Sequence, residues 1–308
     1  MLRACLTAMP PPKRPLAIDT RRVKSFDGTA IAYHATRSPF KGAPAIVLAN
    51  GLGGPHLAWR EQIDFFLDRY QIVTWDYRGL YGSGRPAGTG AEAYAVERHV
   101  RDLQAILAAE GIERASFVGW SMGVQVVLEA FRRLRGVARN LVLLSGTFGR
   151  PLDTLSHLPG ARMVMPSLVR AAGLAHGLAT QVTRRAAGQP EFAAWLKRMG
   201  LIGPTLDDEV FAELMHAFGQ LDMDGYFRNL RALGEHTAED VLETVDVPAL
   251  VITGDRDTFT PPSLAQAMTR RIPGASIVVV RGGTHYTAVE FPELVNLRVE
   301  RFFREHGF

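Results

Sequence analysis

The sequence has little cysteine and no long apolar segment. Cys5 is the only cysteine among 308 residues, so no disulfide can form within the chain. No apolar run approaches the roughly 20 residues that a membrane-spanning helix requires. A chain with one cysteine and no membrane span is typical of the reducing cytoplasm, so we expect a soluble cytoplasmic protein.

Nucleotide-binding and metal-binding motifs are also absent. No glycine cluster has the dinucleotide-binding or P-loop pattern. No group of histidine, cysteine and aspartate residues has the spacing of metal ligands along the sequence. We therefore expect no cofactor and no metal.

The positive charge of the chain is concentrated near its start. Residues 1–25 carry six basic side chains and one acidic one, so the remaining 283 residues sum to −1 despite a total of +4. A nearly neutral body argues against a nucleic-acid groove. Three prolines at residues 10–12 interrupt the first apolar stretch, so residues 1–20 are predicted to be a disordered basic tail and not a secretory signal.

Short apolar runs alternate with helical stretches in residues 21–145 and 246–308. The expected strands are residues 21–25, 30–35, 45–48, 71–74, 116–118, 141–144, 249–253 and 276–280. The expected helices are residues 59–66, 94–110, 122–134, 262–271 and 292–304. This alternation predicts an α/β core with a mostly parallel, eight-stranded sheet flanked by helices. The runs AIVLA, LVLL, ALVIT and SIVVV do not alternate with polar residues, which predicts strands buried on both faces.

The alternation of strands and helices is interrupted in residues 146–245, which contain no strand-like run. Apolar side chains recur there at helical spacing, so we expect a helical cap inserted after the sixth strand. Its apolar side chains either line a substrate pocket or only pack the cap on the core. The candidates are Met163, Met165, Met215, Phe218, Met223 and Phe227.

The strongest local motif is Gly119-Trp120-Ser121-Met122-Gly123, which follows an expected strand and opens an expected helix. A G-x-S-x-G motif in that setting is typical of a nucleophile elbow. The glycines allow close backbone approach, and the helix start directs N–H groups at developing negative charge. Ser121 is therefore the candidate nucleophile.

A serine nucleophile needs a base, and His285 has the most suitable position among the nine histidines. It lies in a loop after an expected strand, where catalytic groups gather in α/β sheets. His56, near the loop after the third strand, is the only other histidine that we do not dismiss. The base also needs an acceptor, and two aspartates after the strand ALVIT compete: Asp255, which could simply stabilise a turn, and Asp257, deeper in the loop.

These motifs resemble those of the α/β-hydrolase superfamily, and the similarity runs over about residues 23–304. The family places its acid in a G-x-x-D-x-x-x-P loop, which matches Gly254, Asp257 and Pro261 and so favours Asp257. The order serine, acid, histidine along the chain is also the family's order. The resemblance implies that Ser121, Asp257 and His285 are the catalytic residues. Thr284 stands before the histidine, where the family usually has glycine.

The resemblance also implies an oxyanion hole. Many relatives carry His-Gly after the third strand, where this chain has Asn50 and Gly51. The backbone N–H groups of Leu52 and Met122 are the expected donors. The family's D-x-R-G-x-G-x-S loop corresponds to residues 76–83, with Tyr81 in place of a glycine, so this turn is expected to differ. We interpret Asp76 and Arg78 there as structural.

The segment NGLGG…AWREQIDFF is similar to 3-oxoadipate enol-lactonases and related carboxylesterases. We therefore expect a serine hydrolase that cleaves an ester or related acyl bond of a hydrophobic small molecule. A lactonase, thioesterase, C–C bond hydrolase or perhydrolase would use the same residues. A non-catalytic ligand-binding protein of this fold is the alternative from another class, and the sequence leaves the oligomeric state open.

Overall fold

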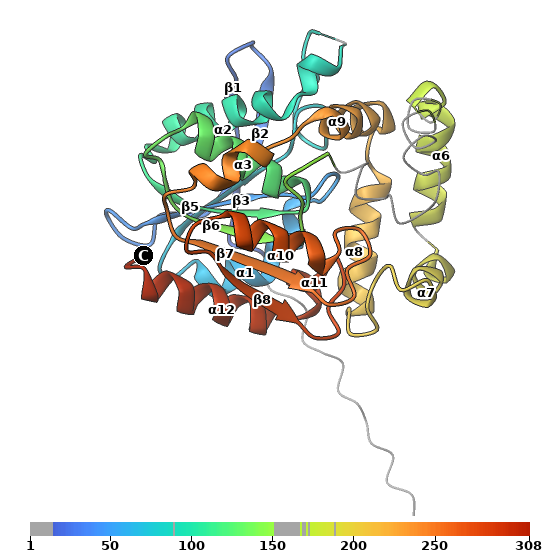
Figure 1. The fold of residues 1–308 in the computed structure, drawn as a ribbon. Coiled ribbons are helices and arrows are strands. Elements are labelled where there is room, and N and C mark those ends of the chain that lie inside the picture. Colours follow the sequence, from blue (N-terminus) through green and yellow to red (C-terminus); the bar gives the residue numbers. More distant parts are fainter. Residues whose placement is uncertain (1–14, 89, 151–166, 168–170, 172, 188) are drawn as a thin grey trace, which may run out of the picture.

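The computed structural model describes residues 15–88, 90–150, 167, 171, 173–187 and 189–308. Its centre is a single sheet of eight strands in the order β1-β2-β4-β3-β5-β6-β7-β8 (Figure 1). Each strand falls where the sequence predicts one, within a few residues at its ends. The strands are β1 (Asp19–Lys24), β2 (Ala30–Ala35), β3 (Ala45–Ala49), β4 (Gln71–Trp75), β5 (Ala115–Trp120), β6 (Ala138–Leu144), β7 (Ala249–Gly254) and β8 (Ser276–Val280).

The sheet is antiparallel at one end and parallel elsewhere. β1 pairs antiparallel with β2, and β2 pairs antiparallel with β4. All pairings from β4 through β3, β5, β6 and β7 to β8 are parallel. The expected mostly parallel sheet is therefore confirmed. Because parallel strands end at the same edge, the loops that follow β3, β5, β7 and β8 gather there.

Burial along the strands follows their place in the sheet. β3, β5 and β7 are buried along their whole length, and so are the residues LVLL of β6. The predicted burial of the runs AIVLA, LVLL and ALVIT is therefore confirmed. β8 is different, because it is the last strand of the sheet and Val279 is 45% exposed. The prediction that the run SIVVV is buried on both faces is therefore wrong. The composition of a strand does not specify whether it lies at the edge of the sheet or between two neighbouring strands.

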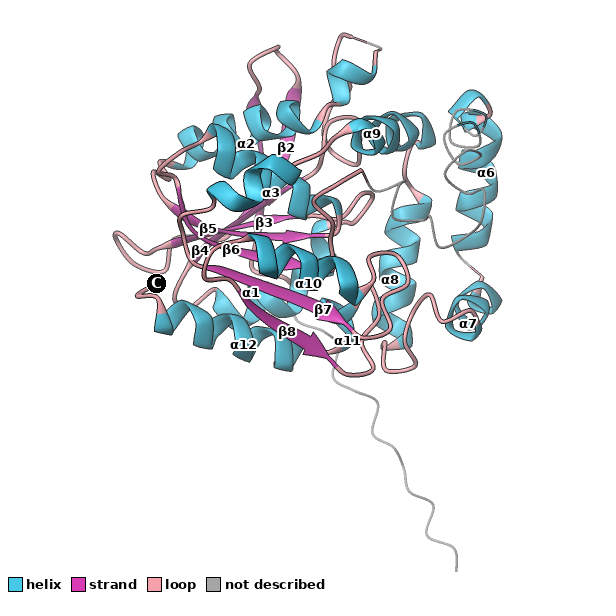
Figure 2. Ribbon diagram, in the orientation of Figure 1, coloured by secondary structure: helices cyan, strands magenta, loops and turns pink. Residues whose placement is uncertain are grey.

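Helices cover both faces of the sheet (Figure 2). One face carries α2 (Val96–Glu110), α3 (Met122–Arg133) and α10 (Pro262–Arg271); the other carries α1 (Arg60–Phe66) and α12 (Pro292–Glu305). Two large hydrophobic clusters result, and β3 contributes to both by alternation. Val47 packs in the cluster with α2, α3 and α10, whereas Ile46 and Leu48 pack in the cluster with α1 and α12.

The described residues between β6 and β7 form helices joined by loops, and no strand occurs among them. It forms α6 (His176–Ala187), α7 (Pro190–Arg198), α8 (Asp208–Gly219), α9 (Met223–Glu235) and the 3-10 helix η4 (Glu239–Thr244). In Figure 1, α8 lies beyond the carboxyl ends of the parallel strands, and α6 and α7 lie outside it. The remaining short helices are η1 (His56–Trp59), η2 (Ala91–Tyr94) and α11 (Thr287–Glu290).

The last residues of the predicted tail are part of the fold. Residues 1–14, including Cys5, lie outside the described residues. Leu16 and Ile18 pack against the cluster formed with α1 and α12, and β1 begins at Asp19. The predicted tail of residues 1–20 therefore extends too far, over residues 15–20. Among the helices that the structure describes, none combines the length and apolarity needed to cross a membrane.

Candidate active site

Ser121 lies in the turn between β5 and α3. Its backbone has φ 57° and ψ −116°, a conformation that costs a non-glycine residue on the order of 1–3 kcal/mol. The flanking glycines are sterically required. A Cβ on Gly119 would lie 2.3 Å from the carbonyl oxygen of Gly123, and a Cβ on Gly123 would lie 2.0 Å from that of Ala49. The G-x-S-x-G spacing thus forms the turn that presents Ser121 at the start of α3.

His285 lies in the loop after β8 and contacts Ser121. Its Nε2 is 2.9 Å from the Oγ of Ser121. The indole N–H of Trp120 donates to the carbonyl oxygen of His285 at 2.9 Å. The imidazole is 12% exposed, so it is largely shielded from water. Two residues separated by 164 positions in the sequence are therefore within hydrogen-bonding distance.

Asp257 lies in the loop after β7 and faces the other side of the imidazole. Its Oδ2 is 3.0 Å from His285 Nδ1. Burial raises the pKa of Asp257, but hydrogen bonds from His285 and Thr260 and the interaction with His285 outweigh it, so the pKa lies below the ordinary value. An ionised carboxylate only accepts hydrogen bonds, so Nδ1 of His285 carries the proton and Nε2 presents its lone pair to Ser121.

Asp255, the competing aspartate, does not contact the imidazole. Its Oδ1 accepts the backbone N–H of Gly282 at 2.7 Å, and its own N–H donates to the carbonyl of Val280 at 3.0 Å. It therefore ties the loop after β7 to the loop after β8. Asp255 thus stabilises the turn, which was one of the two roles considered for it from the sequence.

Three residues that sequence reasoning missed support these loops. Thr260 donates its backbone N–H and its hydroxyl to Asp257, both at 2.8 Å. Glu290 accepts the N–H of Thr284 at 2.8 Å and the hydroxyl of Thr284 at 2.6 Å. The threonine that departs from the family's glycine is thus hydrogen-bonded to Glu290. The third residue is Trp120. Its place within the G-x-S-x-G motif is the only sequence feature that could have pointed to its role.

The loop after β3 approaches the serine from the other side. A Cβ on Gly51 would lie 3.3 Å from the Cβ of Ser121, so Leu52 follows a residue in close contact with the serine. Asn50 braces this loop: its side-chain amide donates to the carbonyl of Trp75 at 3.1 Å, and its side-chain oxygen accepts the indole N–H of Trp59. The asparagine therefore fixes the loop through buried hydrogen bonds.

The loop of residues 76–83 braces the same segment. Tyr81 has φ +47°, so a tyrosine occupies a backbone conformation that favours glycine. Its hydroxyl donates to the carbonyl oxygen of Gly53 at 2.5 Å. Arg78 is fully buried and donates to Asp102 through Nε at 2.9 Å and Nη2 at 2.5 Å. Arg78 is thus held in an ion pair within the core, in accordance with its structural interpretation.

His56, the other histidine that the sequence left open, does not reach Ser121. Its ring stacks on that of His34 with centroids 3.7 Å apart. Burial and the neighbouring His34 lower the pKa of His56 to about 4. It therefore belongs to a group of side chains separate from Ser121 and His285.

A cavity of about 430 Å³ opens over Ser121 and His285. Its walls are mainly apolar and come from the core and from α8 and α9. The lining residues include Leu52, Trp120, Phe211, Met215, Phe218 and Tyr226. Of the predicted pocket candidates, Met215 and Phe218 line the cavity, whereas Met223 and Phe227 pack against the core cluster. Met163 and Met165 lie outside the described residues.

Comparison with protein families gives one match that spans most of the chain. The model described as the alpha/beta hydrolase family matches residues 46–298. A curated relative, the proposed carbamate hydrolase RutD of Escherichia coli O7:K1 strain IAI39, is 27% identical over 258 residues. That alignment covers 84% of this chain and 90% of the relative.

Solved structures with the same fold are more distant in sequence. Bromoperoxidase from Bacillus anthracis has a TM-score of 0.74 at 16% identity, covering 93% of this chain and all of that one. The enol-lactonase from Burkholderia xenovorans LB400 has a TM-score of 0.70 at 22% identity, covering 92% of this chain and 100% of that one. At these identities the likeness concerns the fold.

Proposed function

The chain belongs to the alpha/beta hydrolase family, and we propose that it is a serine hydrolase that cleaves an ester or related acyl bond through an acyl-enzyme on Ser121. The observation that carries the proposal is the pair of contacts made by His285, at 2.9 Å to Ser121 Oγ and 3.0 Å to Asp257 Oδ2. A serine hydroxyl becomes nucleophilic when a base accepts its proton, and the base works when an acceptor fixes its tautomer.

In the proposed first step, Ser121 Oγ forms a bond to the acyl carbon while its proton passes to Nε2 of His285. The negative charge that develops on the carbonyl oxygen is stabilised by the backbone N–H groups of Leu52 and Met122. Loss of one such donor typically slows catalysis about 10²- to 10³-fold. The bond to the leaving group then breaks, and the leaving group takes the proton from His285.

In the second step, His285 removes a proton from water, and the resulting hydroxide adds to the acyl carbon. Collapse of this intermediate releases the acid and returns the proton to Ser121. Asp257 stabilises the imidazolium in both steps and, with its low pKa, remains ionised. In the proposed cycle His285 thus accepts and returns every proton that is transferred.

We further propose that residues 146–245 act as a cap that selects hydrophobic small molecules. Phe211 and Met215 from α8 and Tyr226 from α9 contribute to the cavity wall. Apolar walls bind an aliphatic or aromatic acyl group by removing it from water. A carbamate is the second candidate substrate, because the RutD relative covers 84% of the chain. Lactones, thioesters and C–C bonds are further substrates of the same mechanism.

The test is covalent labelling with a fluorophosphonate probe. Wild-type protein is expected to be labelled at Ser121, whereas Ser121→Ala is expected to stay unlabelled and His285→Ala to react at least about 10³-fold more slowly. A matched panel of p-nitrophenyl esters, carbamates, lactones and thioesters then identifies the bond type. A wild-type protein that resists the probe and cleaves none of these compounds would favour a ligand-binding protein of hydrolase fold instead.

A further inference from the structure

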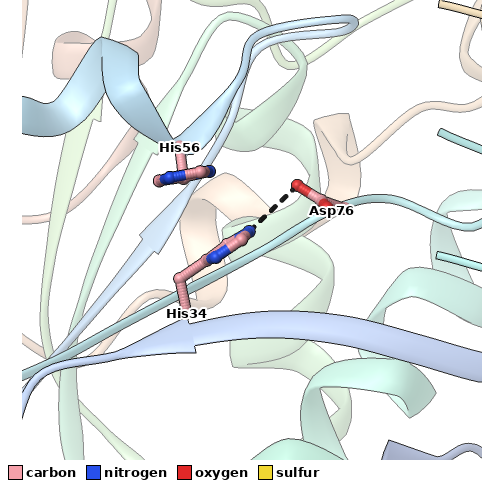
Figure 3. Close-up of side chains that lie close together, drawn as sticks. All are labelled: His34, His56 and Asp76. Atoms are coloured by element: carbon pink, nitrogen blue, oxygen red, sulfur yellow. Dashed lines mark hydrogen bonds and ion pairs between the residues drawn. The ribbon is translucent and has the colours of Figure 1, made fainter. Parts of the chain in front are cut away.

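A second cluster of chemically reactive side chains is drawn in Figure 3. It consists of His34 from β2, His56 from the first residue of η1, and Asp76, which directly follows β4. One potential ligand atom from each residue lies within 4.8 Å of those of the other two. His34 and Asp76 are buried and His56 is half-buried. None of the three lines the cavity over Ser121.

The outer atoms of two of these side chains are already held in place. His34 Nδ1 is 3.0 Å from the hydroxyl of Thr20, and Asp76 Oδ2 accepts the backbone N–H of Gly82 at 3.0 Å. Their inner atoms, His34 Nε2 and Asp76 Oδ1, face each other at 3.3 Å. Metal-binding histidines and carboxylates are usually oriented in this way, with the atom that does not bind the metal hydrogen-bonded to an outer partner.

His56 supplies the third side of the cluster. Its ring is stacked over that of His34, with 25° between the planes, and hydrogen-bonds to no residue in the described part of the chain. An imidazole without a hydrogen-bond partner beside a carboxylate and a second imidazole leaves its nitrogen free to bind a cation. Two imidazoles and one carboxylate are a donor set that suits zinc and the neighbouring transition metals.

We propose that His34, His56 and Asp76 bind one divalent transition-metal ion, with zinc as the preferred ion, and that water completes the coordination. Zinc–ligand bonds of about 2.0–2.2 Å place the ligand atoms of a tetrahedral site roughly 3.4 Å apart. An imidazole binds a metal through a lone pair in its ring plane, and the rings of His56 and His34 are stacked with 25° between the planes. The ring of His56 must therefore rotate out of the stack to direct a nitrogen at the ion. Its side chain is only half-buried, which leaves room for this rotation.

The ion would join three separate segments of the chain. β2, the loop after β3 and the start of the 76–83 loop contribute one ligand each, and the loop after β3 also carries Leu52. An ion that binds the folded state and not the unfolded chain raises the melting temperature with its concentration. Because the cluster does not open into the cavity, the ion would act on stability. The inference is independent of the proposed hydrolysis.

The test is metal binding by the full-length, tag-free protein after treatment with a chelator. Zinc is titrated by calorimetry, cobalt(II) is followed by its visible absorption, and bound metal is counted after dialysis. Wild-type protein is expected to bind one equivalent of zinc, with a higher melting temperature and the strong absorption of a tetrahedral cobalt site. His56→Gln is expected to weaken zinc binding by at least about 10- to 100-fold, and Thr20→Val by about 10-fold.

The matched control is His216→Gln, which removes an exposed histidine on α8 and is expected to bind zinc like the wild type. If His34→Gln fails to fold, the comparison of His56→Gln with the control still decides the matter. Equal zinc affinity for His56→Gln and wild type, or no zinc binding by wild-type protein, would overturn the proposal. His34 and Asp76 would then be only a hydrogen-bonded pair of the core.

Discussion

The indole N–H of Trp120 donates a 2.9 Å hydrogen bond to the carbonyl oxygen of His285. Trp120 is the last residue of β5 and stands directly before Ser121. The residue next to the serine therefore holds the backbone that carries the imidazole. This bond couples the two loops whose separation determines the contact between Ser121 and His285.

Replacing Trp120 with phenylalanine removes this bond and leaves the His285 carbonyl without the donor. We expect a loss of about 1–3 kcal/mol in the free energy of unfolding and roughly 10-fold slower labelling by a fluorophosphonate. Urea denaturation and labelling kinetics measure the two effects. Trp75→Phe is the matched control, since the Trp75 indole N–H has no hydrogen-bond partner among the described residues. Labelling of Trp120→Phe at the wild-type rate would contradict the coupling.

Exchange of Asp257 for asparagine tests which aspartate supports the base. An amide in place of the carboxylate no longer fixes the tautomer of His285 or stabilises the imidazolium. We expect the labelling rate to fall by on the order of 10³- to 10⁴-fold. Asp255→Asn alters only a bond to the backbone of Gly282 and is expected to label within a few-fold of wild type. The opposite ranking of the two variants would assign the role to Asp255.

The lowered pKa of Asp257 predicts a specific dependence of stability on pH. A carboxyl group with a depressed pKa stabilises the fold above the unfolded value of about 3.9, and this contribution disappears as the pH falls through the folded value. Below about pH 4, the free energy of unfolding of wild type should therefore fall more steeply than that of Asp257→Asn. The difference is at most about 1.4 kcal/mol per pH unit, the slope for one proton. Urea titrations in acid measure it, and parallel slopes would disprove the depressed pKa.

The hydrogen bond from Tyr81 to the Gly53 carbonyl links the 76–83 loop to the loop after β3. Tyr81→Phe removes the bond to the Gly53 carbonyl, with an expected cost of about 1 kcal/mol and several-fold slower labelling, because the neighbouring Leu52 N–H is then less well positioned. Tyr70→Phe is the control: it removes a tyrosine bond to the carbonyl of Phe308, outside the cavity. Equal labelling by the two variants would show that Tyr81 contributes to stability alone.

The position of Phe218 in the cavity wall is expected to limit the length of the acyl chain that the cavity accepts. Phe218→Ala enlarges the cavity, so the ratio of kcat/KM for laurate over butyrate p-nitrophenyl esters should rise at least about 10-fold. Phe227→Ala is the control, because Phe227 packs against the core cluster and is not part of the cavity wall. An unchanged ratio for Phe218→Ala would mean that the acyl chain binds elsewhere.

Local patterns in the sequence predicted most of the fold. Apolar runs and helical periodicity located all eight strands, and the glycine spacing around Ser121 located the elbow, because sterics at a tight turn act on adjacent residues. The candidate serine, acid and histidine were each predicted from a motif at a strand end. The choice of Asp257 over Asp255 depended on family resemblance. Nothing in the residues themselves states which carboxylate will face an imidazole 28 or 30 positions away.

The tertiary structure alone decided the features that depend on distant neighbours. The exposure of Val279 follows from the place of β8 at the sheet edge, and the bracing roles of Thr260 and Glu290 follow from loop packing. His34, His56 and Asp76 have no ligand spacing along the chain, yet the pairing of β2 with β4 and the course of the loop after β3 bring them together. The periodicity of apolar residues indicates which face of each segment is buried. Contacts between segments depend on the order of the strands in the sheet, which periodicity does not specify.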